Sequence, residues 1–292
     1  MIAIDWGTSN FRAFRMNDRA EIIETRSSHE GILRIRERRF QETLLSQIGD
    51  WLVTGETRIL LCGMVGSRQG WVETGYLPCP VGLTNLANQL VRIPLAGLEI
   101  FLVPGVVGSD AYGVPEMMRG EETQAIGVLE SHGGGVVCSP GTHSKWINLS
   151  DDAIVDFTTC MTGDVFDALR SSTILSRIMT TDAAMDTEAF HRGVARSGDT
   201  GGLLHHLFGV RALALVDQLK EESSASYLSG LLIGHEVRKS MSAGTHVHLV
   251  GDTQLCSLYA QAISACEGFF TFEDEHAAAR GLAAIGRKLS WI

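Results

Sequence analysis

The sequence predicts an α/β fold in two halves, and three observations lead to that prediction. Apolar segments of strand length alternate with longer segments of helical periodicity throughout the 292-residue chain. A polar turn that contains glycine follows a strand in each half, at residues 5–10 and again at 139–144. The length suits two domains of roughly 150 residues each. We expect them to cover residues 1–112 and 113–292, divided within the glycine-rich stretch 104–115.

In the first half, a strand, a turn and a second strand predict a hairpin, and a helix then precedes a buried strand. The expected elements are strands over residues 2–4, 11–14, 58–62 and 99–103 and a helix over 40–52. The segment 63–80 is rich in glycine, proline and polar residues, yet it carries Trp71 and Tyr76. Bulky side chains of this kind indicate a structured, functional loop rather than a linker.

The second half repeats the hairpin and then becomes mostly helical. The expected strands cover residues 136–138, 145–149, 246–250 and 269–272. The expected helices cover residues 121–130, 163–179, 203–220, 225–241, the segment from 253 onward, and 276–289. Strands and helices mix in both halves, which is typical of the α/β class.

The composition excludes several classes of protein. Hydrophobic residues make up 45% and charged residues 20%, as in an ordinary globular protein. The 24 basic and 34 acidic residues give a net charge of −10, which disfavours nucleic acid and acidic membranes as partners. The first residues lack the features of a signal peptide, and the six cysteines are dispersed without a CxxC pair. We therefore expect a cytoplasmic protein with reduced thiols.

The two polar turns, DWGTSN and SPGTHS, have the composition that a phosphate clamp requires. Glycine lets the backbone approach a ligand closely, and successive N–H and hydroxyl groups can face anionic oxygens. Each turn alone is more often a plain hairpin turn. A third segment, VHLVGDT at residues 247–253, ends a strand just before a helix, where a nucleotide can bind. Asp252 or Thr253 could equally be a simple N-cap there.

The order of these segments carries a resemblance to a known superfamily. IDWGTSN, a Gly-Glu-Glu helix start, SPGT, VGDT and a terminal ARGL helix resemble the sugar kinases, actin and heat-shock chaperone ATPases. Three longer strings, GMVGSRQGW at 63–71, MRGEETQ at 118–124 and SPGTHSKW at 139–146, resemble the 2-dehydro-3-deoxygalactonokinase family. The resemblance implies two ribonuclease-H-like domains around an ATP cleft. It also implies phosphorylation of the 6-hydroxyl of 2-dehydro-3-deoxy-D-galactonate, a step of galactonate catabolism.

The resemblance also gives each motif a part in phosphoryl transfer, which depends on positioning and charge neutralisation. Asp5 would hold hydrated Mg²⁺, an ion that needs few protein ligands. The phosphates of ATP would be cradled by Gly7, Thr8, Ser9 and Asn10 and by Gly141, Thr142 and His143. The adenosine would be bordered by Gly251, Asp252 and Thr253. Lys145 would reach a phosphate or the substrate carboxylate, although a solvated surface cation is an equal alternative.

The sugar acid would bind at the loop Gly66, Ser67, Arg68, because a carboxylate calls for a cation or hydrogen-bond donors. Trp71 would form a wall of that pocket, and Arg12, just beyond the first turn, is a further candidate. Without the resemblance, Arg68 would be interpreted as a surface residue and Trp71 as a core residue.

For the general base, Glu122 matches the superfamily position best and Glu121 next, but both depart from the aspartate usual there. Asp164, which opens a helix after the second turn, is the alternative. Each carboxylate could instead simply stabilise the first turn of its helix through the macrodipole.

Other functions stay open at this point. The clamp alone also fits a kinase for another sugar or sugar acid, a nucleotide-gated ATPase, or an exopolyphosphatase-like hydrolase. The signatures of P-loop, dinucleotide-binding, zincin and GxSxG enzymes are missing from the sequence. We expect ATP and Mg²⁺ as cofactors, a small sugar acid as the partner, and no nucleic acid or membrane. A homo-oligomer is possible.

Overall fold

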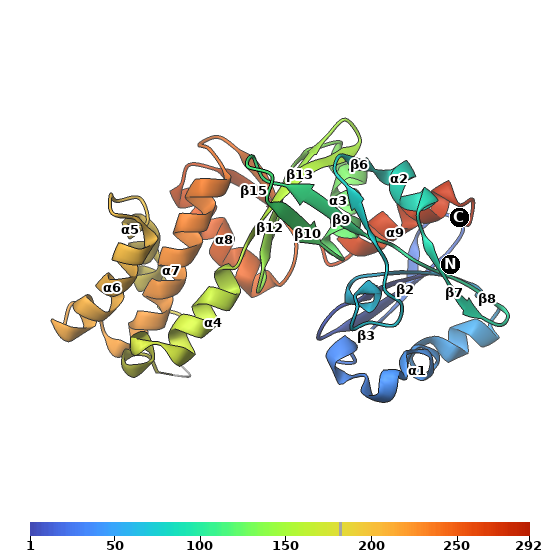
Figure 1. The fold of residues 1–292 in the computed structure, drawn as a ribbon, viewed down its shortest axis with the longest axis horizontal. Helices are drawn as coiled ribbons and strands as arrows, with labels where there is room; N and C mark the ends of the chain where they lie inside the picture. The colour runs from blue at the N-terminus through green and yellow to red at the C-terminus, as the bar shows by residue number, and fades with distance from the viewer. Residues whose placement is uncertain (181–182) are drawn as a thin grey trace. The chain divides into compact units, whose positions relative to one another are not determined.

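A computed structural model describes residues 1–180 and 183–292 of the chain. It divides into two compact units (Figure 1). Unit 1 consists of Met1–Gly135, Ile147–Phe157 and Glu273–Ile292, and unit 2 of Val136–Trp146 and Thr158–Phe272. These bounds differ from the contiguous domains 1–112 and 113–292 expected from the sequence, which stay a prediction. The difference arises because the chain returns to unit 1 twice, whereas a division by chain position assumes a single crossing.

Unit 1 is built on a six-stranded mixed sheet of order β3-β2-β1-β4-β8-β7. Its strands are β1 (Ile2–Trp6), β2 (Phe11–Met16), β3 (Ile22–Ser28), β4 (Arg58–Cys62), β7 (Val91–Leu95) and β8 (Leu98–Leu102). The β1–β2 hairpin is antiparallel, as the sequence predicts, and β1, β4 and β8 run parallel.

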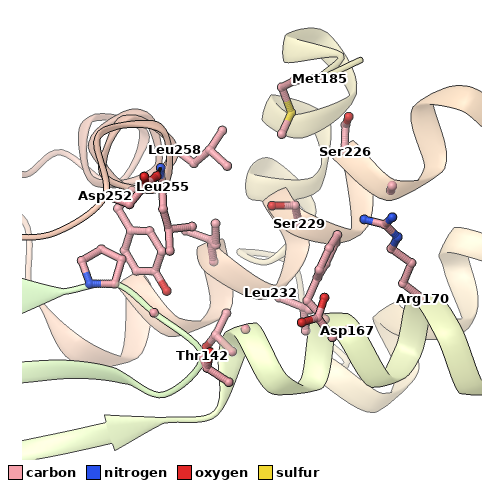
Figure 2. A pocket seen from close by; sticks show the side chains of 18 of the residues that line it. Thr142, Asp167, Arg170, Met185, Ser226, Ser229, Leu232, Asp252, Leu255 and Leu258 are labelled. Atoms are coloured by element: carbon pink, nitrogen blue, oxygen red, sulfur yellow. Dashed lines mark hydrogen bonds between the residues drawn. The ribbon is translucent and has the colours of Figure 1, made fainter. Parts of the chain in front are cut away.

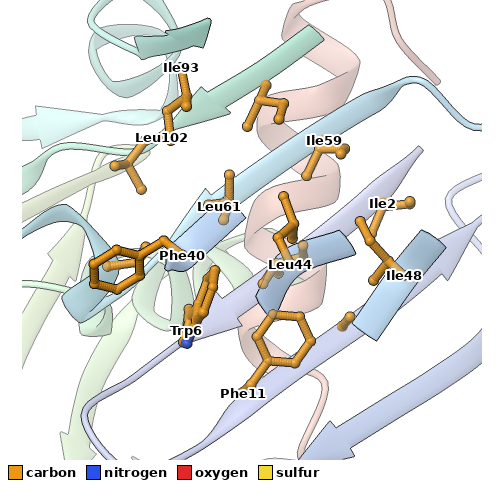
Figure 3. Packing of buried hydrophobic residues seen from close by; sticks show 14 of the residues in the cluster. Ile2, Trp6, Phe11, Phe40, Leu44, Ile48, Ile59, Leu61, Ile93 and Leu102 are labelled. Atoms are coloured by element: carbon orange, nitrogen blue, oxygen red, sulfur yellow. The ribbon is translucent and has the colours of Figure 1, made fainter. Parts of the chain in front are cut away.

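The helix α1 (Phe40–Val53) covers one face of this sheet and forms a hydrophobic core with it (Figure 3). Ile2, Ile4 and Trp6 point into that core. Because side chains alternate along a strand, Asp5 points to the opposite face of the sheet. The sequence therefore places one carboxylate on the face away from α1, at the end of a buried strand.

The rest of unit 1 contains a second sheet and three further helices. A three-stranded sheet of order β10-β9-β5 contains β5 (Tyr76–Pro78), β9 (Gly105–Ser109) and β10 (Pro115–Met118). The remaining elements are β6 (Val81–Gly82), α2 (Leu83–Asn88), α3 (Glu121–His132) and α9 (Ala277–Lys288). The helices α3 and α9 cross closely, because a Cβ atom on Gly127 would collide with the carbonyl oxygen of Ala277. Helix α9 also contacts β1 and β4.

Unit 2 contains the parallel strands β11 (Gly135–Ser139), β14 (His246–Leu249) and β15 (Phe269–Phe272). The strand β12 (Ser144–Ser150) begins in unit 2 beside β11 and continues in unit 1, and β13 (Ala153–Cys160) follows it. Its helices are α4 (Thr162–Ser172), α5 (Thr187–Arg196), α6 (Gly202–Leu215), α7 (Glu221–Ser240) and α8 (Thr253–Ala265). Helix α7 contacts each of the other four.

Most elements expected from the sequence are confirmed. The elements that were not expected are β3, β5, β6, β7, β10, β13, α2 and α5. The expected helix 163–179 ends at Ser172 and is followed by a 3-10 turn, Ile174–Ile178. The glycine-rich stretch 104–115 contains β9 rather than a linker. Among the described residues, no helix is both long and apolar enough to cross a membrane.

Candidate active site

The first polar turn joins β1 to β2. The N–H of Gly7 donates to the carbonyl of Asn10 at 2.9 Å and closes the turn. The carbonyl oxygens of residues 7–9 accept hydrogen bonds from the backbone of residues 31–33 at 3.0–3.2 Å. The side chains of Thr8, Ser9 and Asn10 are exposed. Hydroxyl groups therefore line the outer side of this turn, which suits contact with anionic oxygens.

Asp5 lies at the base of the same turn and is almost completely buried. Its Oδ2 accepts a hydrogen bond from Nη2 of Arg12 at 2.7 Å, across the β1–β2 pair. Its Oδ1 lies 4.0 Å from Sγ of Cys62, the last residue of β4. Arg12 thus neutralises part of the charge of Asp5, while the carboxylate remains a hard oxygen ligand of the kind that Mg²⁺ prefers.

Two glycines pack together beside Asp5, where β4 ends and α3 begins. Gly63 has a φ of +93° and Gly120 a φ of +109°, a region that favours glycine. A Cβ atom on Gly63 would lie 3.2 Å from Oδ1 of Asp5, and one on Gly120 would lie 3.2 Å from Cα of Gly63. The backbone therefore comes close to the carboxylate in a way that a side chain at either position would prevent.

Glu122, in the first turn of α3, is fully buried. Its Oε2 accepts a hydrogen bond from the N–H of Gly120 at 2.6 Å, whereas its Oε1 has no hydrogen-bond partner among the described residues. Burial, and then the charge of Glu121, raise the pKa of Glu122 from 4.5 to about 8. A carboxyl group with a pKa near neutrality is a candidate for proton transfer.

The buried thiol of Cys62 shows that these carboxylates share one environment. Burial raises its pKa well above the usual value, and the negative charges of Asp5 and Glu122 raise it further. The side chain of Thr123, which follows Glu122 in α3, hydrogen-bonds to this thiol. The structure therefore brings together Asp5, Arg12 and Glu122 around one thiol of unit 1.

Glu121 is partly exposed, and its Oε2 accepts a hydrogen bond from the backbone N–H of Arg119 at 3.0 Å. The carboxylates of Glu121 and Glu122 thus accept hydrogen bonds from the two successive N–H groups, of Arg119 and Gly120, that precede α3. Both carboxylates also lie in the first turn of α3, where the macrodipole favours negative charge.

The loop expected to bind the sugar acid has a buried part and an exposed part. Gly66 is buried, as is Oγ of Ser67, which has no hydrogen-bond partner among the described residues. The side chain of Arg68 is 88% exposed, and its Nε lies 3.4 Å from a carboxylate oxygen of Glu73. Trp71 stacks on Phe40 with ring centroids 6.4 Å apart and packs against the core of unit 1.

Arg119 is a residue of this region that the sequence analysis missed. It is buried, and its Nη2 donates to the carbonyl of Thr74 at 3.0 Å, while Nη1 bonds to the hydroxyl of Thr74. Its guanidinium carbon lies 4.5 Å from the ring centroid of Tyr76. Arg119 therefore fastens the loop to the segment that starts α3. Its position next to Gly-Glu-Glu in MRGEETQ and the bulky Tyr76 in the loop were the available signals.

In unit 2, the second polar turn lies against the start of α4. The N–H of Asp164 donates to the carbonyl of Thr142 at 3.1 Å, and a Cβ atom on Gly163 would lie 2.6 Å from the carbonyl oxygen of Gly141. Nε2 of His143 lies 3.7 Å from Oδ2 of Asp164, and both side chains are about half exposed. Asp164 is thus attached to the second turn.

Lys145, at the start of β12, is buried rather than a solvated surface cation. Its Nζ donates to the carbonyl of His143 at 2.9 Å, within the turn. Its position next to the second turn is the one expected of a cation that reaches a phosphate.

A cavity of about 620 Å³ opens between the second turn and helices α4, α7 and α8 (Figure 2). Its lining is mostly apolar, with a few polar groups, as is usual for small-molecule sites. Its walls include Thr142 from the turn, Phe166, Asp167 and Arg170 from α4, Ser226, Ser229 and Leu232 from α7, and Leu255, Leu258 and Tyr259 from α8. The cavity was not anticipated from the sequence, because its walls come from segments far apart in the chain.

The Gly-Asp-Thr motif stands at one edge of this cavity. Asp252 lines it and also caps α8, since its Oδ1 accepts hydrogen bonds from the N–H groups of Gln254 and Leu255, both at 3.0 Å. Gly251 has a φ of +141° and precedes the cap, and Thr253 is exposed. The predicted nucleotide residues Gly141, Thr142 and Asp252 therefore meet at one cavity, while Gly251 and Thr253 flank Asp252 in the chain.

Comparisons with known proteins identify the family of this chain. The family model described as 2-keto-3-deoxy-galactonokinase matches residues 5–285. A protein of Rhizobium meliloti (strain 1021), named probable 2-dehydro-3-deoxygalactonokinase DgoK1, is 35% identical over 98% of this chain and 96% of its own length. The 2-dehydro-3-deoxygalactonokinase of Escherichia coli (strain K12) is 34% identical over 90% of this chain and 89% of its own.

Solved structures confirm the fold. A crystal structure from Sinorhizobium meliloti, assigned to the same kinase, has a TM-score of 0.88 and 34% identity over 99% of this chain and 98% of its own. The activator of the 2-hydroxyisocaproyl-CoA dehydratase from Clostridium difficile with bound ADPNP has a TM-score of 0.52 at 12% identity and shows a similar fold. The fold is that of the actin-like ATPases and sugar kinases. The chain therefore belongs to the 2-keto-3-deoxy-galactonokinase family of carbohydrate kinases.

Proposed function

We propose that this protein transfers the γ-phosphoryl group of ATP to the 6-hydroxyl of 2-dehydro-3-deoxy-D-galactonate and releases ADP. Membership of the family and the names of the relatives support this reaction. We further propose that it acts in the cytoplasm as part of galactonate catabolism, which its six free cysteines support. Association into a homo-oligomer stays a prediction.

In this proposal, the cavity of unit 2 receives the adenosine. Leu232, Leu255 and Leu258 offer apolar surface to the base, while Asp167 and Ser229 offer polar groups. The second turn at the edge of the cavity then faces the phosphates with Gly141 and Thr142. Lys145, buried beside the turn, supplies positive charge there.

Unit 1 supplies the ion site and the acceptor site. The carboxylate of Asp5 fits hydrated Mg²⁺, because it offers oxygen ligands at a place where glycine at position 63 leaves room next to Oδ1. When bound, the ion neutralises charge on the phosphates. Gly7, Thr8, Ser9 and Asn10 contact the phosphate chain through the outer side of the first turn. Arg12 orients Asp5 and contributes a positive charge at the same point.

We propose that Oε1 of Glu122 accepts the proton of the attacking hydroxyl. Support comes from its missing hydrogen-bond partner among the described residues and from its pKa of about 8, which is close to the pH at which a base operates best. Because Glu122 is fully covered, this role requires a local movement that exposes Oε1 when the acceptor binds. Glu121 and Asp164 are the alternative bases, since both are accessible.

The carboxylate of the sugar acid is assigned to the loop of Gly66, Ser67 and Arg68, with Trp71 as a wall and Arg12 as a second cation. The exposed guanidinium of Arg68 can form a charge-assisted pair at the cost of only a weak contact with Glu73. Arg119 holds the base of this loop and so acts on the substrate through the loop.

The observation that carries the proposal is the gathering of Asp5, Arg12 and Glu122 around Cys62, in a chain that matches the kinase family from residue 5 to 285.

The test measures ADP release with MgATP and a panel of acceptors. The panel contains 2-dehydro-3-deoxy-D-galactonate, its gluco epimer, other sugar acids, neutral sugars, and water alone. We expect release only with a 2-keto-3-deoxy sugar acid. Release without an acceptor would favour a nucleotide-gated ATPase or an exopolyphosphatase-like hydrolase instead.

A further inference from the structure

Glu236 of α7 is a second buried carboxylate, and it lies in unit 2 beneath the second turn. Both of its oxygens are hydrogen-bonded. Oε1 accepts from Nε1 of Trp146 and Oε2 from the hydroxyl of Tyr259, each at 2.7 Å. The side chains of Thr162 and Ser144 also hydrogen-bond to this carboxylate. Four side chains from three other elements therefore meet at one glutamate.

These four side chains belong to the parts that form the proposed nucleotide site. Ser144 and Trp146 are the first and third residues of β12, immediately after the second turn. Because side chains alternate along a strand, both point to the side of Glu236, and Lys145 between them points to the other side. The contacts of Glu236 thus fix the orientation of the strand that carries Lys145.

The other two side chains line the nucleotide cavity itself. Thr162 is the first residue of α4, and Tyr259 lies in α8. Both belong to the wall of the cavity, and the hydroxyl of Tyr259 lies 2.8 Å from Oγ of Ser144. Tyr259 therefore presents its ring to the cavity and its hydroxyl to the network.

The chemistry of the network explains why a carboxylate is needed. The indole N–H of Trp146 can only donate a hydrogen bond, and the hydroxyl of Tyr259 also donates its hydrogen bond to Glu236. A carboxylate accepts at both oxygens, whereas an amide would turn an NH₂ donor toward one of these donors. Burial raises the pKa of Glu236, and the surrounding hydrogen bonds act in the opposite direction, favouring the charged form.

We propose that Glu236 is a positioning residue for nucleotide binding, which holds the second turn and the wall of the cavity in their relative places through Trp146, Ser144 and Tyr259. It does not touch the nucleotide. The inference rests on the proposed function, since it assumes that this cavity and turn hold ATP. It names the residue that keeps them in place.

The test uses the full-length protein with Glu236→Gln and, separately, Tyr259→Phe, which keeps the ring in the cavity wall. The measurements are the Kd of ADP by titration calorimetry, and the KM values of ATP and of the sugar acid. We expect both variants to weaken ADP binding and raise the KM of ATP at least tenfold, with the KM of the sugar acid within twofold of wild type. Tyr227→Phe, a buried tyrosine of the same helix as Glu236, is the control and should behave as wild type.

Three outcomes would overturn the inference. One is an unchanged Kd for ADP in folded Tyr259→Phe and Glu236→Gln. Another is an equal loss of affinity for ATP and sugar acid, which indicates general destabilisation. A third is failure of the wild-type protein to bind ADP. If Glu236→Gln does not fold, Tyr259→Phe and Ser144→Ala decide by the same measurements. If ADP binds as expected but no sugar acid is phosphorylated, the proposed function fails while this inference stands.

Discussion

Glu122 in unit 1 and Glu236 in unit 2 are both buried, and the surroundings of the two carboxylates differ. Glu122 in unit 1 accepts one backbone hydrogen bond through Oε2, while its Oε1 lacks a partner among the described residues. Glu236 in unit 2 accepts hydrogen bonds from side chains at both oxygens. Burial raises the pKa of both groups.

The difference separates two uses of a buried charge. A carboxylate whose oxygens are all hydrogen-bonded fixes its neighbours and gains little from changing its protonation state. A buried oxygen without a partner costs free energy in the resting protein, and such sites are common where chemistry takes place. The comparison therefore supports the two proposed roles, positioning for Glu236 and proton transfer for Glu122.

The first prediction tests the chemical side of the comparison and has the largest expected effect. Replacing Glu122 by Gln should lower kcat by about 10²- to 10⁴-fold, the usual contribution of a general base, while both substrates still bind. Steady-state kinetics with MgATP and sugar acid measure this. Asp164→Asn and Glu121→Gln are the matched variants and should lose less. A larger loss in either of them would transfer the role of base to that residue.

The second prediction concerns stability and follows from the raised pKa of Glu122. Its folded-state pKa of about 8 lies above the ordinary value of 4.5, so the folded protein binds this proton more tightly than the unfolded chain. The corresponding stabilisation is present below pH 4.5 and is lost as pH rises toward 8. At about 1.4 kcal/mol per pKa unit, the loss is on the order of 5 kcal/mol.

Denaturant unfolding of wild type and Glu122→Gln at several pH values between 5 and 8.5 measures that loss. The free energy of unfolding of the variant should improve relative to wild type as pH rises, because glutamine does not titrate. Glu236→Gln, in contrast, should be less stable than wild type across this range, because it leaves donors unpaired. A constant difference between wild type and Glu122→Gln would show that Glu122 is already ionised in the folded protein.

The third prediction concerns Asp5, the second carboxylate that acts on the thiol of Cys62. Asp5→Asn should leave the fold intact and reduce turnover by about 10²- to 10³-fold, since it removes the charge proposed to hold Mg²⁺. Turnover is measured at saturating MgATP, and circular dichroism checks the fold. Arg12→Ala leaves the carboxylate of Asp5 in place but removes its ion-pair partner and the second cation proposed for the sugar acid, and it should reduce turnover at saturating substrates less. Near-normal turnover of Asp5→Asn would reject the metal role.

The fold was largely predictable from the sequence because its hairpins and helices are encoded locally. The strand in the stretch 104–115 was not predictable, because its glycines are required by contacts with residues far away in the chain. A Cβ atom on Gly105 would lie 2.7 Å from the ring of Tyr76, and one on Gly108 would lie 3.3 Å from the ring of Phe157. The glycines of β9 therefore make room for aromatic rings, whereas glycine density in a sequence is typical of a linker.

Only those parts of the candidate site that lie in a recognisable sequence motif were predictable. The two turns and the start of α3 stand out as strings, and their residues do gather within each unit. Arg119 bonds to Thr74 across 45 positions, and Ser144 bonds to Tyr259 across 115. Contacts of that range leave no periodicity or spacing in the sequence, so these anchoring residues appear only in the structure.

The last prediction compares the KM of the sugar acid with the KM of ATP after a change at Arg68, and the expected effect is the smallest of the four. Arg68→Ala should raise the KM of the sugar acid by about 10- to 100-fold, because loss of a charge-assisted hydrogen bond costs about 1.5 to 3 kcal/mol. The KM of ATP should stay within twofold, since Arg68 is not among the residues proposed to contact the nucleotide. Glu73→Gln removes the present partner of Arg68 and should leave or lower the KM of the sugar acid. Arg92→Ala, another exposed arginine of unit 1, should change neither value. Equal increases for ATP and sugar acid in Arg68→Ala would show that this loop does not distinguish the two substrates, and the carboxylate would then have to bind elsewhere.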